Sequence, residues 1–170
     1  MSQTKIRTQA WRNGEVVAKD FDLERALELL NDSCSIWIDI AGTDPAALTP
    51  IARQLNLDAN AVEDAFSAHE RPKLDRLPDH QFLNCYSVRF HADTARLTKQ
   101  EISIFITGRA FITVHHDDTI DPLAYAAQYS ESHEVLRYGV PGLLHGLLDV
   151  VVDGYLDALQ TFDDSIEDLE

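Results

Sequence analysis

The sequence predicts an α/β fold of the α+β-like kind: a mixed sheet with an antiparallel meander, flanked by helices and followed by one long C-terminal helix. Two observations lead to this prediction. Apolar and polar residues alternate over several short segments, as they do in half-buried strands, and segments with helical spacing lie between them. From Leu148 onward, apolar residues recur at intervals of four and three, which is the spacing of a long amphipathic helix.

The N-terminal part of the chain predicts strands and helices in alternation, and each helix begins at an aspartate that can cap it, with Asn60 as the alternative cap of the third helix. Asn13-Gly14 is a strong signal for a hairpin between the first two strands. The predicted strands cover residues 5–11, 15–18 and 35–40. The predicted helices run from Asp22 to Leu30, from Asp44-Pro45 onward, and from Asp58 to Phe66.

A polar loop and the antiparallel meander come next. Residues 69–75 are polar and contain a proline, so we expect them to form a loop. The strands of the meander are predicted over residues 81–90, 101–107 and 110–115, with a tight turn at Thr107-Gly108-Arg109. A further helix is expected from Asp121-Pro122 to Glu134.

The C-terminal segment predicts a helix of about 28 residues, which is roughly 42 Å long at a rise of about 1.5 Å per residue. We therefore divide the chain into an α/β domain over residues 1–138 and the start of a long, projecting stalk helix over residues 139–170. Because the pattern reaches Glu170 without a stop signal, we expect the chain to be a fragment whose helix continues. The seam of this helix consists of Leu148, Val152, Tyr155, Leu159, Phe162, Ile166 and Leu169.

The charge of the chain argues against several classes of partner. Fourteen lysines and arginines stand against 29 aspartates and glutamates, which gives a net charge of −15. Nucleic acids and anionic membrane surfaces attract clustered basic residues, so this balance disfavours both and favours cations. The acidity is concentrated near the C-terminus, where no lysine or arginine follows Arg137 and eight acidic residues lie between Asp149 and Glu170.

Two further features bear on the compartment of the chain. Cys34 and Cys85 lie in apolar, strand-like segments, which favours buried free thiols over a disulfide. The N-terminus lacks the apolar core of a signal peptide, and no segment approaches the ~18 apolar residues of a membrane span. We therefore expect a reducing environment for this part of the protein.

Two groups of carboxylates are candidates for binding cations. Asp149, Asp153 and Asp157 lie four residues apart and share one side of the C-terminal helix; they form either a solvated flank or, at Asp149 beside the seam, a cation contact. Glu63 and Asp64 are adjacent in a short predicted helix. Such acids usually face solvent, but hard oxygen ligands of this kind also suit Mg²⁺, which takes one or two carboxylates and keeps several waters.

The histidines offer no strong metal motif. The cluster His115-His116-Asp117-Asp118 follows a predicted strand, and we favour a solvated strand end over a site for a borderline metal. No zinc-protease, phosphate-loop, dinucleotide or nucleophile-elbow pattern occurs in the sequence. We therefore predict no catalytic residue and no site for an organic cofactor.

Several sequence blocks recur in a fixed order and spacing, namely Val62-Glu63-Asp64, Arg71-Pro72-Lys73, Asp79-His80-Gln81-Phe82, residues 101–105, residues 111–115 and residues 143–155. With these blocks, residues 36–170 resemble the N-terminal cytoplasmic domain of the CorA-type family of divalent-cation transporters. One departure is Asp58-Ala59, where the family often has His-Pro before the helix that carries the acidic pair. The membrane helices and the Gly-Met-Asn pore signature of the family are absent from the chain.

The resemblance implies a regulatory, Mg²⁺-sensing domain on the cytoplasmic side of the membrane, attached to a magnesium or cobalt channel. It implies a homopentamer in the intact protein, with contact to the membrane only through the missing helices. It also implies weak regulatory Mg²⁺, or alternatively Co²⁺ or Zn²⁺, at Glu63, Asp64 and Asp149. It implies no enzymatic activity. Three alternatives stay open: the corresponding domain of a zinc transporter, a soluble Mg²⁺-dependent enzyme with a pocket and a general base near these acids, and a coiled-coil interaction module.

Overall fold

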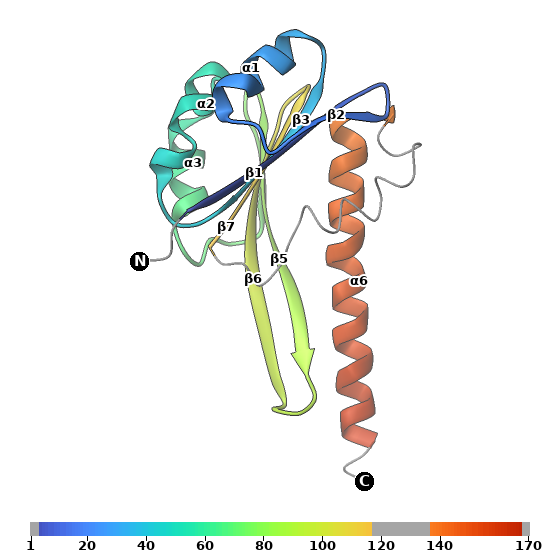
Figure 1. Cartoon of the computed structure of the whole chain (residues 1–170). Helices are drawn as coiled ribbons and strands as arrows, with labels where there is room; N and C mark the ends of the chain where they lie inside the picture. Colours follow the sequence, from blue (N-terminus) through green and yellow to red (C-terminus); the bar gives the residue numbers. More distant parts are fainter. Residues whose placement is uncertain (1–3, 117–136, 168–170) are drawn as a thin grey trace.

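The computed structural model describes residues 4–116 and 137–167, and it has a seven-stranded mixed sheet with helices on both faces (Figure 1). The strand order is β2-β1-β3-β7-β6-β5-β4, and the β3–β7 pair is parallel whereas the other neighbours are antiparallel. The strands are β1 (Lys5–Arg12), β2 (Glu15–Lys19), β3 (Ser35–Ala41), β4 (Lys73–Arg76), β5 (Gln81–His91), β6 (Arg96–Ile106) and β7 (Ala110–His115). The helices are α1 (Leu23–Asn31), η1 (Pro45–Ala47), α2 (Thr49–Gln54), α3 (Ala59–Phe66) and α6 (Val140–Glu167).

The predicted fold class is confirmed, and so are the aspartate caps. The Asp22 carboxylate accepts a hydrogen bond from the Arg25 N–H, and Asp58 accepts from the N–H groups of the first turn of α3. Asp44 caps a short 3₁₀ helix, after which α2 begins as a separate helix. At the hairpin between β1 and β2, Asn13 and Gly14 both have positive φ, as a type I′ turn requires.

Two predictions in the meander are corrected by the structure. Part of the predicted loop 69–75 is strand β4, which pairs antiparallel with β5 at the edge of the sheet. Its side chains are mostly charged because an edge strand meets solvent and must resist pairing with other chains. Strand β6 begins at Arg96, five residues before the predicted start, because a polar hairpin tip continues the pairing with β5. The helix expected from Asp121 lies outside the described residues.

The sheet separates two apolar cores. Alternate residues of β3 point to opposite faces: Ile36, Ile38 and Ile40 pack under the helices α1, α2 and α3, whereas Trp37 packs on the side of α6. The core on the α6 side is completed by residues of α6 and of the central strands, namely Leu143, Leu147, Val151, Ile102, Ile104 and Phe111. As a result, α3 and α6 lie on opposite faces of the sheet (Figure 1).

Helix α6 has the predicted length, but it does not project alone from the body. The long hairpin of β5 and β6 runs beside it (Figure 1). The Tyr155 hydroxyl donates to the Tyr86 carbonyl oxygen at 2.5 Å, and the rings of Phe90 and Phe162 meet edge to face at 5.4 Å. Several apolar side chains that border this contact stay exposed, namely Val152, Leu156, Leu159 and Ile166. Within the described ranges, no helix combines the length and the apolar character that a membrane crossing needs.

A buried polar network crosses the centre of the sheet on the α6 side. The carboxylate of Asp39, only 1% exposed, accepts hydrogen bonds from Arg7 at 2.6 Å and from the Thr113 hydroxyl at 2.6 Å. Nε2 of His115 lies 3.2 Å from the same carboxylate, and the Trp37 indole donates to Thr113 at 2.9 Å. Burial alone would raise the pKa of Asp39, but the neighbouring His115, Thr113 and Arg7 hold this pKa below its ordinary value.

We predict that Asp39→Asn lowers the free energy of unfolding by about 3 kcal/mol at pH 7, because Arg7 and His115 lose the carboxylate that they face in the interior. Since the folded pKa of Asp39 is depressed, its stabilisation is present above the unfolded value of 3.8 and is lost as the pH falls through the folded value. Urea denaturation of both proteins should therefore show a difference that is full at neutral pH and shrinks below about pH 4.

The exposed carboxylate of Asp153 supplies the control, because Asp153→Asn removes the same charge at the surface. Equal stability of the Asp39 and Asp153 variants at pH 7 would contradict the assignment of Asp39 as a central element of the fold.

Candidate functional site

Helix α3 positions the first two predicted carboxylates. Asp58 caps the helix. The apolar face of α3 packs into the core through Ala61, Ala65 and Phe66. Glu63 is exposed on the opposite side, whereas Asp64 is half-buried and faces β4. The two acids therefore share a helix but point into different surroundings.

Asp64 has a cationic partner on β4. The ammonium group of Lys73 lies 2.5 Å from Asp64 Oδ2, 3.6 Å from Asp75 Oδ2 and 3.7 Å from Glu70 Oε2, which places it among three carboxylates. It also lies 5.5 Å from the centre of the Phe82 ring. The hydrogen bond to Asp64, with the charges of the neighbouring acids, raises the pKa of Lys73 above its ordinary value. Lys73 is therefore a permanent positive charge in this cluster.

Glu101 holds the segment between α3 and β4 against the sheet. Its carboxylate accepts hydrogen bonds from the backbone N–H groups of His69 at 2.9 Å and Glu70 at 3.1 Å, and from the Asn84 side chain at 2.8 Å. The Tyr86 hydroxyl donates to the Glu70 carbonyl oxygen at 2.6 Å and lies 3.2 Å from Glu101. These bonds fix the turn at His69, whose φ is +73°.

One buried hydrogen-bond acceptor beside this cluster, the side-chain carbonyl oxygen of Asn84, is unsatisfied among the described residues. Asn84 is the register partner of Lys73 in the β4–β5 pair and is fully buried. Its amide nitrogen donates to Glu101 and to the Ser103 hydroxyl, but its carbonyl oxygen has no hydrogen-bond partner in the described part of the chain. A fully buried oxygen without a donor is costly, so this patch has more acceptors than its own donors satisfy.

Sequence analysis did not select Lys73 or Glu101. Lys73 was part of the block Arg71-Pro72-Lys73 and had no predicted role. Its position between Glu70 and Asp75, close in sequence to the acidic pair on α3, was a signal for an ion pair. The role of Glu101 depends on a strand pairing that joins it to Asn84 and on a loop that folds back onto it. Contacts between segments that are distant in the sequence leave no local sequence pattern, so this role of Glu101 could not be predicted.

Asp149 lies on α6, on the opposite face of the sheet from α3. It is exposed, as are Asp153 and Asp157 on the same side of the helix. The structure therefore does not bring Asp149 together with Glu63 and Asp64 within one chain. Among the residues that the structure describes, no group of three or more histidine, cysteine, aspartate or glutamate side chains is arranged to hold a metal ion.

The His115 cluster differs from the expected solvated strand end. His115 is fully buried, with Nε2 at Asp39 and Nδ1 3.2 Å from the Gln100 amide nitrogen. Its position at the end of β7, in register with β3, carries it into the interior network. Asp117 and Asp118 lie outside the described residues.

The cysteines are free thiols, as expected. Cys34 is buried and Cys85 half-buried, and burial raises the pKa of Cys85 to about 11. A thiol with such a pKa is protonated at neutral pH, so Cys85 is a weak nucleophile there.

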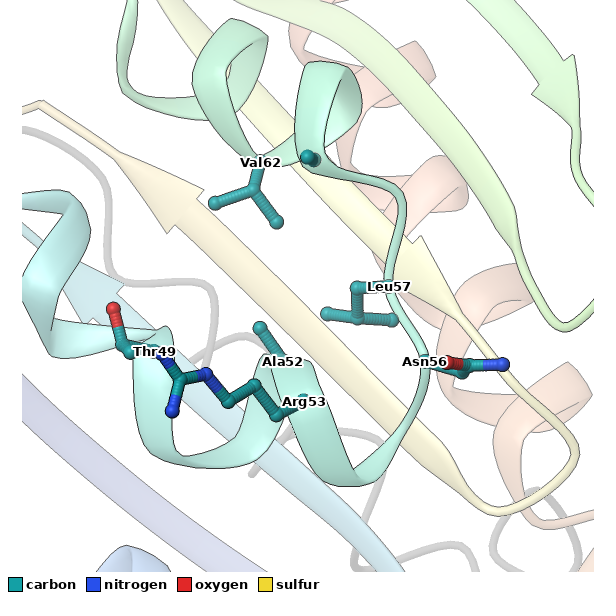
Figure 2. Close-up of a pocket in the computed structure, with 7 residues that line it drawn as sticks. Thr49, Ala52, Arg53, Asn56, Leu57 and Val62 are labelled. Carbon is teal, nitrogen blue, oxygen red and sulfur yellow. The ribbon is translucent and has the colours of Figure 1, made fainter.

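A hollow of about 410 Å³ lies between α2 and α3 (Figure 2). Leu57 and Val62 contribute apolar side chains, and Arg53 contributes a guanidinium group. None of the candidate carboxylates lines it, so it has neither the ligands of a Mg²⁺ site nor the arrangement that the enzyme alternative requires. The complete lining is Thr49, Ala52, Arg53, Asn56, Leu57, Ala59 and Val62.

Comparison with known proteins finds several similar chains. The chain is 23% identical over 155 residues to the cobalt/magnesium transport protein CorA of Thermotoga maritima, which covers 89% of this chain and 44% of that protein. It superposes on the soluble domain of CorA from Methanocaldococcus jannaschii with a TM-score of 0.71 at 18% identity, covering 97% of this chain and 62% of that structure. The cytoplasmic domain of ZntB from Vibrio parahaemolyticus gives a TM-score of 0.53 at 17% identity, over 79% of this chain and 52% of the other.

The chain thus spans less than half the length of the Thermotoga relative. The family model described as CorA-like Mg2+ transporter protein matches residues 32–170, which is most of the chain and includes α3, the β4–β7 strands and α6. The fold comparison agrees with this match, because the sheet and the long helix on its second face superpose on the CorA soluble domain. The chain belongs to the CorA-like Mg²⁺ transporter family.

Proposed function

We propose that this chain is the cytoplasmic, Mg²⁺-sensing part of a CorA-like magnesium or cobalt channel, and that it regulates the channel without carrying the pore. The observation that supports the proposal best is the placement of the candidate carboxylates on opposite faces of one sheet, with Glu63 and Asp64 on α3 and Asp149 on α6. When copies of such a subunit form a ring, the α3 face of one can meet the α6 face of the next. A divalent ion would then bridge two chains.

The charge of the chain gives this bridge its regulatory effect. Each chain carries a net charge of −15, so neighbouring copies repel one another. Mg²⁺ between them offsets the repulsion and stabilises the closed ring. When Mg²⁺ is lost, the repulsion returns and the ring loosens. Because Mg²⁺ keeps most of its waters, a site with two or three carboxylates is weak and empties when the cytosolic concentration falls.

A related zinc transporter is the second candidate. The likeness to the ZntB cytoplasmic domain supports it, although at a lower TM-score and over less of the chain than the likeness to the CorA soluble domain. Carboxylate ligands without a histidine or cysteine favour Mg²⁺ over Zn²⁺ at the proposed regulatory positions. Uptake of Mg²⁺, Co²⁺ and Zn²⁺ into liposomes that contain the full-length protein decides which ion is transported.

We predict that Asp64→Asn and Asp149→Asn each raise the Mg²⁺ concentration required for half-maximal protease protection of the cytoplasmic domain by about fivefold, with Glu63→Gln acting in the same direction. The same shift should appear in the Mg²⁺ concentration that closes the channel. The measurement uses the full-length protein in detergent or liposomes, because the proposed site lies between subunits.

Asp157→Asn and Asp164→Asn are the matched controls, since both acids are exposed on α6 and lose the same charge. We expect little change in either. If all of these variants shift the Mg²⁺ response equally, the response reflects total charge, and the assignment of Glu63, Asp64 and Asp149 is wrong.

We also predict that the 170-residue chain alone does not form a stable pentamer. Its charge opposes association, and the membrane helices proposed to hold the ring are absent from it. The exposed apolar side of α6 promotes weak pairing at most. Light scattering at micromolar concentration should give monomers or small, concentration-dependent oligomers, and a robust pentamer in low salt with chelator would disprove this.

A further inference from the structure

We propose that Lys73 is a built-in counter-cation for Asp64, and that a divalent ion binds at Asp64 by displacing the Lys73 ammonium group. This inference rests on the proposed function, because it concerns the same carboxylate. It adds a residue that sets the Mg²⁺ concentration to which the site responds, and this residue contributes no ligand atom.

The geometry makes Lys73 the resident cation of this cluster. Its ammonium group lies between Asp64 of α3, at 2.5 Å, and two acids on its own side of the loop, Glu70 and Asp75, at 3.7 and 3.6 Å. The side chains of Lys73 and Asp64 are each about 30% exposed, at 29% and 31%, so water and ions can reach the pair. The shortest contact thus joins the candidate ligand to the lysine.

A lysine and a metal ion compete for the same oxygen. An ammonium group has donors only and cannot act as a ligand, whereas Mg²⁺ needs oxygen lone pairs at about 2.1 Å. Oδ2 of Asp64 already accepts a hydrogen bond from the Lys73 ammonium group. An ion bound to that oxygen would lie within a few ångströms of a second positive charge, so the ammonium group must move away from Asp64.

The displaced Lys73 ammonium group keeps two carboxylate partners. Glu70 and Asp75 flank its ammonium group and remain as partners when the contact with Asp64 is broken. The exchange therefore keeps Lys73 neutralised, which lowers the cost of opening the site. Asn84, the register partner of Lys73 in the β4–β5 pair, adds a buried carbonyl oxygen that no donor among residues 4–116 and 137–167 satisfies.

The surrounding structure does not depend on the lysine. Glu101 anchors the backbone at His69 and Glu70 with hydrogen bonds that do not involve Lys73. Lys73 lies on an edge strand, and its ammonium group lies 5.5 Å from the centre of the Phe82 ring, an apolar surface that a methionine side chain can cover. Lys73→Met is therefore a conservative way to remove the charge.

The decisive experiment compares Lys73→Met with Lys99→Met in the full-length protein, with MgCl₂ as the probe. Lys99 lies over the Tyr86 ring on the neighbouring strand β6, so its variant removes the same charge away from Asp64. We expect Lys73→Met to lower the Mg²⁺ needed for half-maximal protease protection by about fivefold, or about 1 kcal/mol at about 1.4 kcal/mol per tenfold. Lys99→Met should change it little, and Lys73→Arg should restore the normal response.

An unchanged or raised Mg²⁺ requirement in Lys73→Met overturns the inference, because a residue that only positions Asp64 would weaken the site when it is removed. An equal effect of Lys99→Met overturns it as well. Asp149→Asn separates the two proposals: if it shifts the Mg²⁺ response and Lys73→Met does not, only the counter-cation is wrong. If neither variant, nor Asp64→Asn, alters the response, the proposed function is wrong.

A measurement on the unmodified protein avoids any question of folding. The ammonium signal of Lys73 in ¹H–¹⁵N NMR is observable at neutral pH when the ion pair slows its exchange with water. Addition of MgCl₂ should shift and broaden this signal and leave that of Lys99 unchanged. A Lys73 signal that does not respond to Mg²⁺ concentrations that protect the protein would disprove displacement.

Discussion

The parallel pairing of β3 with β7 is the constraint on which both faces of this molecule depend. The two strands are far apart in sequence and meet in the middle of the sheet, where their alternate residues supply two separate cores. Asp39 on β3 and Thr113 on β7 are direct partners in this register, so the buried network forms only when the pairing is correct. A register shift would place a carboxylate where no donor can reach it. The same pairing holds α3 and α6 apart, one on each face, and thereby separates the two sets of acidic residues.

Sequence reasoning succeeded where structure is local. The aspartate caps at Asp22 and Asp58 act on N–H groups two or three residues away, and the heptad spacing of α6 is visible in any window of the segment. It failed where the structure of a segment depends on strands that are distant in the sequence. The residues of β4 are too polar to resemble a strand, and only the neighbouring β5 makes them one. His115 at a strand end has the composition of a solvated site, but the register with β3 buries it beside Asp39.

The candidate site illustrates the same division. Glu63 and Asp64 could be selected from the sequence because they are adjacent acids on a short helix, and the family resemblance drew attention to them. The counter-charge of Asp64 had only a weak signal in the sequence, a lysine between two acids, because its approach to Asp64 depends on a loop that Glu101 and Tyr86 hold from two other strands. A motif such as Arg71-Pro72-Lys73 marks Lys73 as part of the family pattern, but it does not indicate what the residue does. The distance between the Lys73 ammonium group and the Asp64 carboxylate gives that role a physical basis.

The hairpin of β5 and β6 beside α6 has a mechanical consequence. Contacts at Tyr155 and Phe162 attach the outer half of the helix to the hairpin, and Leu159, one turn after Tyr155, lies beside them on the same side of the helix. The outer half of α6 therefore acts on the body of the molecule through the hairpin. Strands β5 and β6 continue from that hairpin into the central sheet and carry Asn84 and Glu101, so the same two strands connect the far end of the helix with the cluster at Asp64.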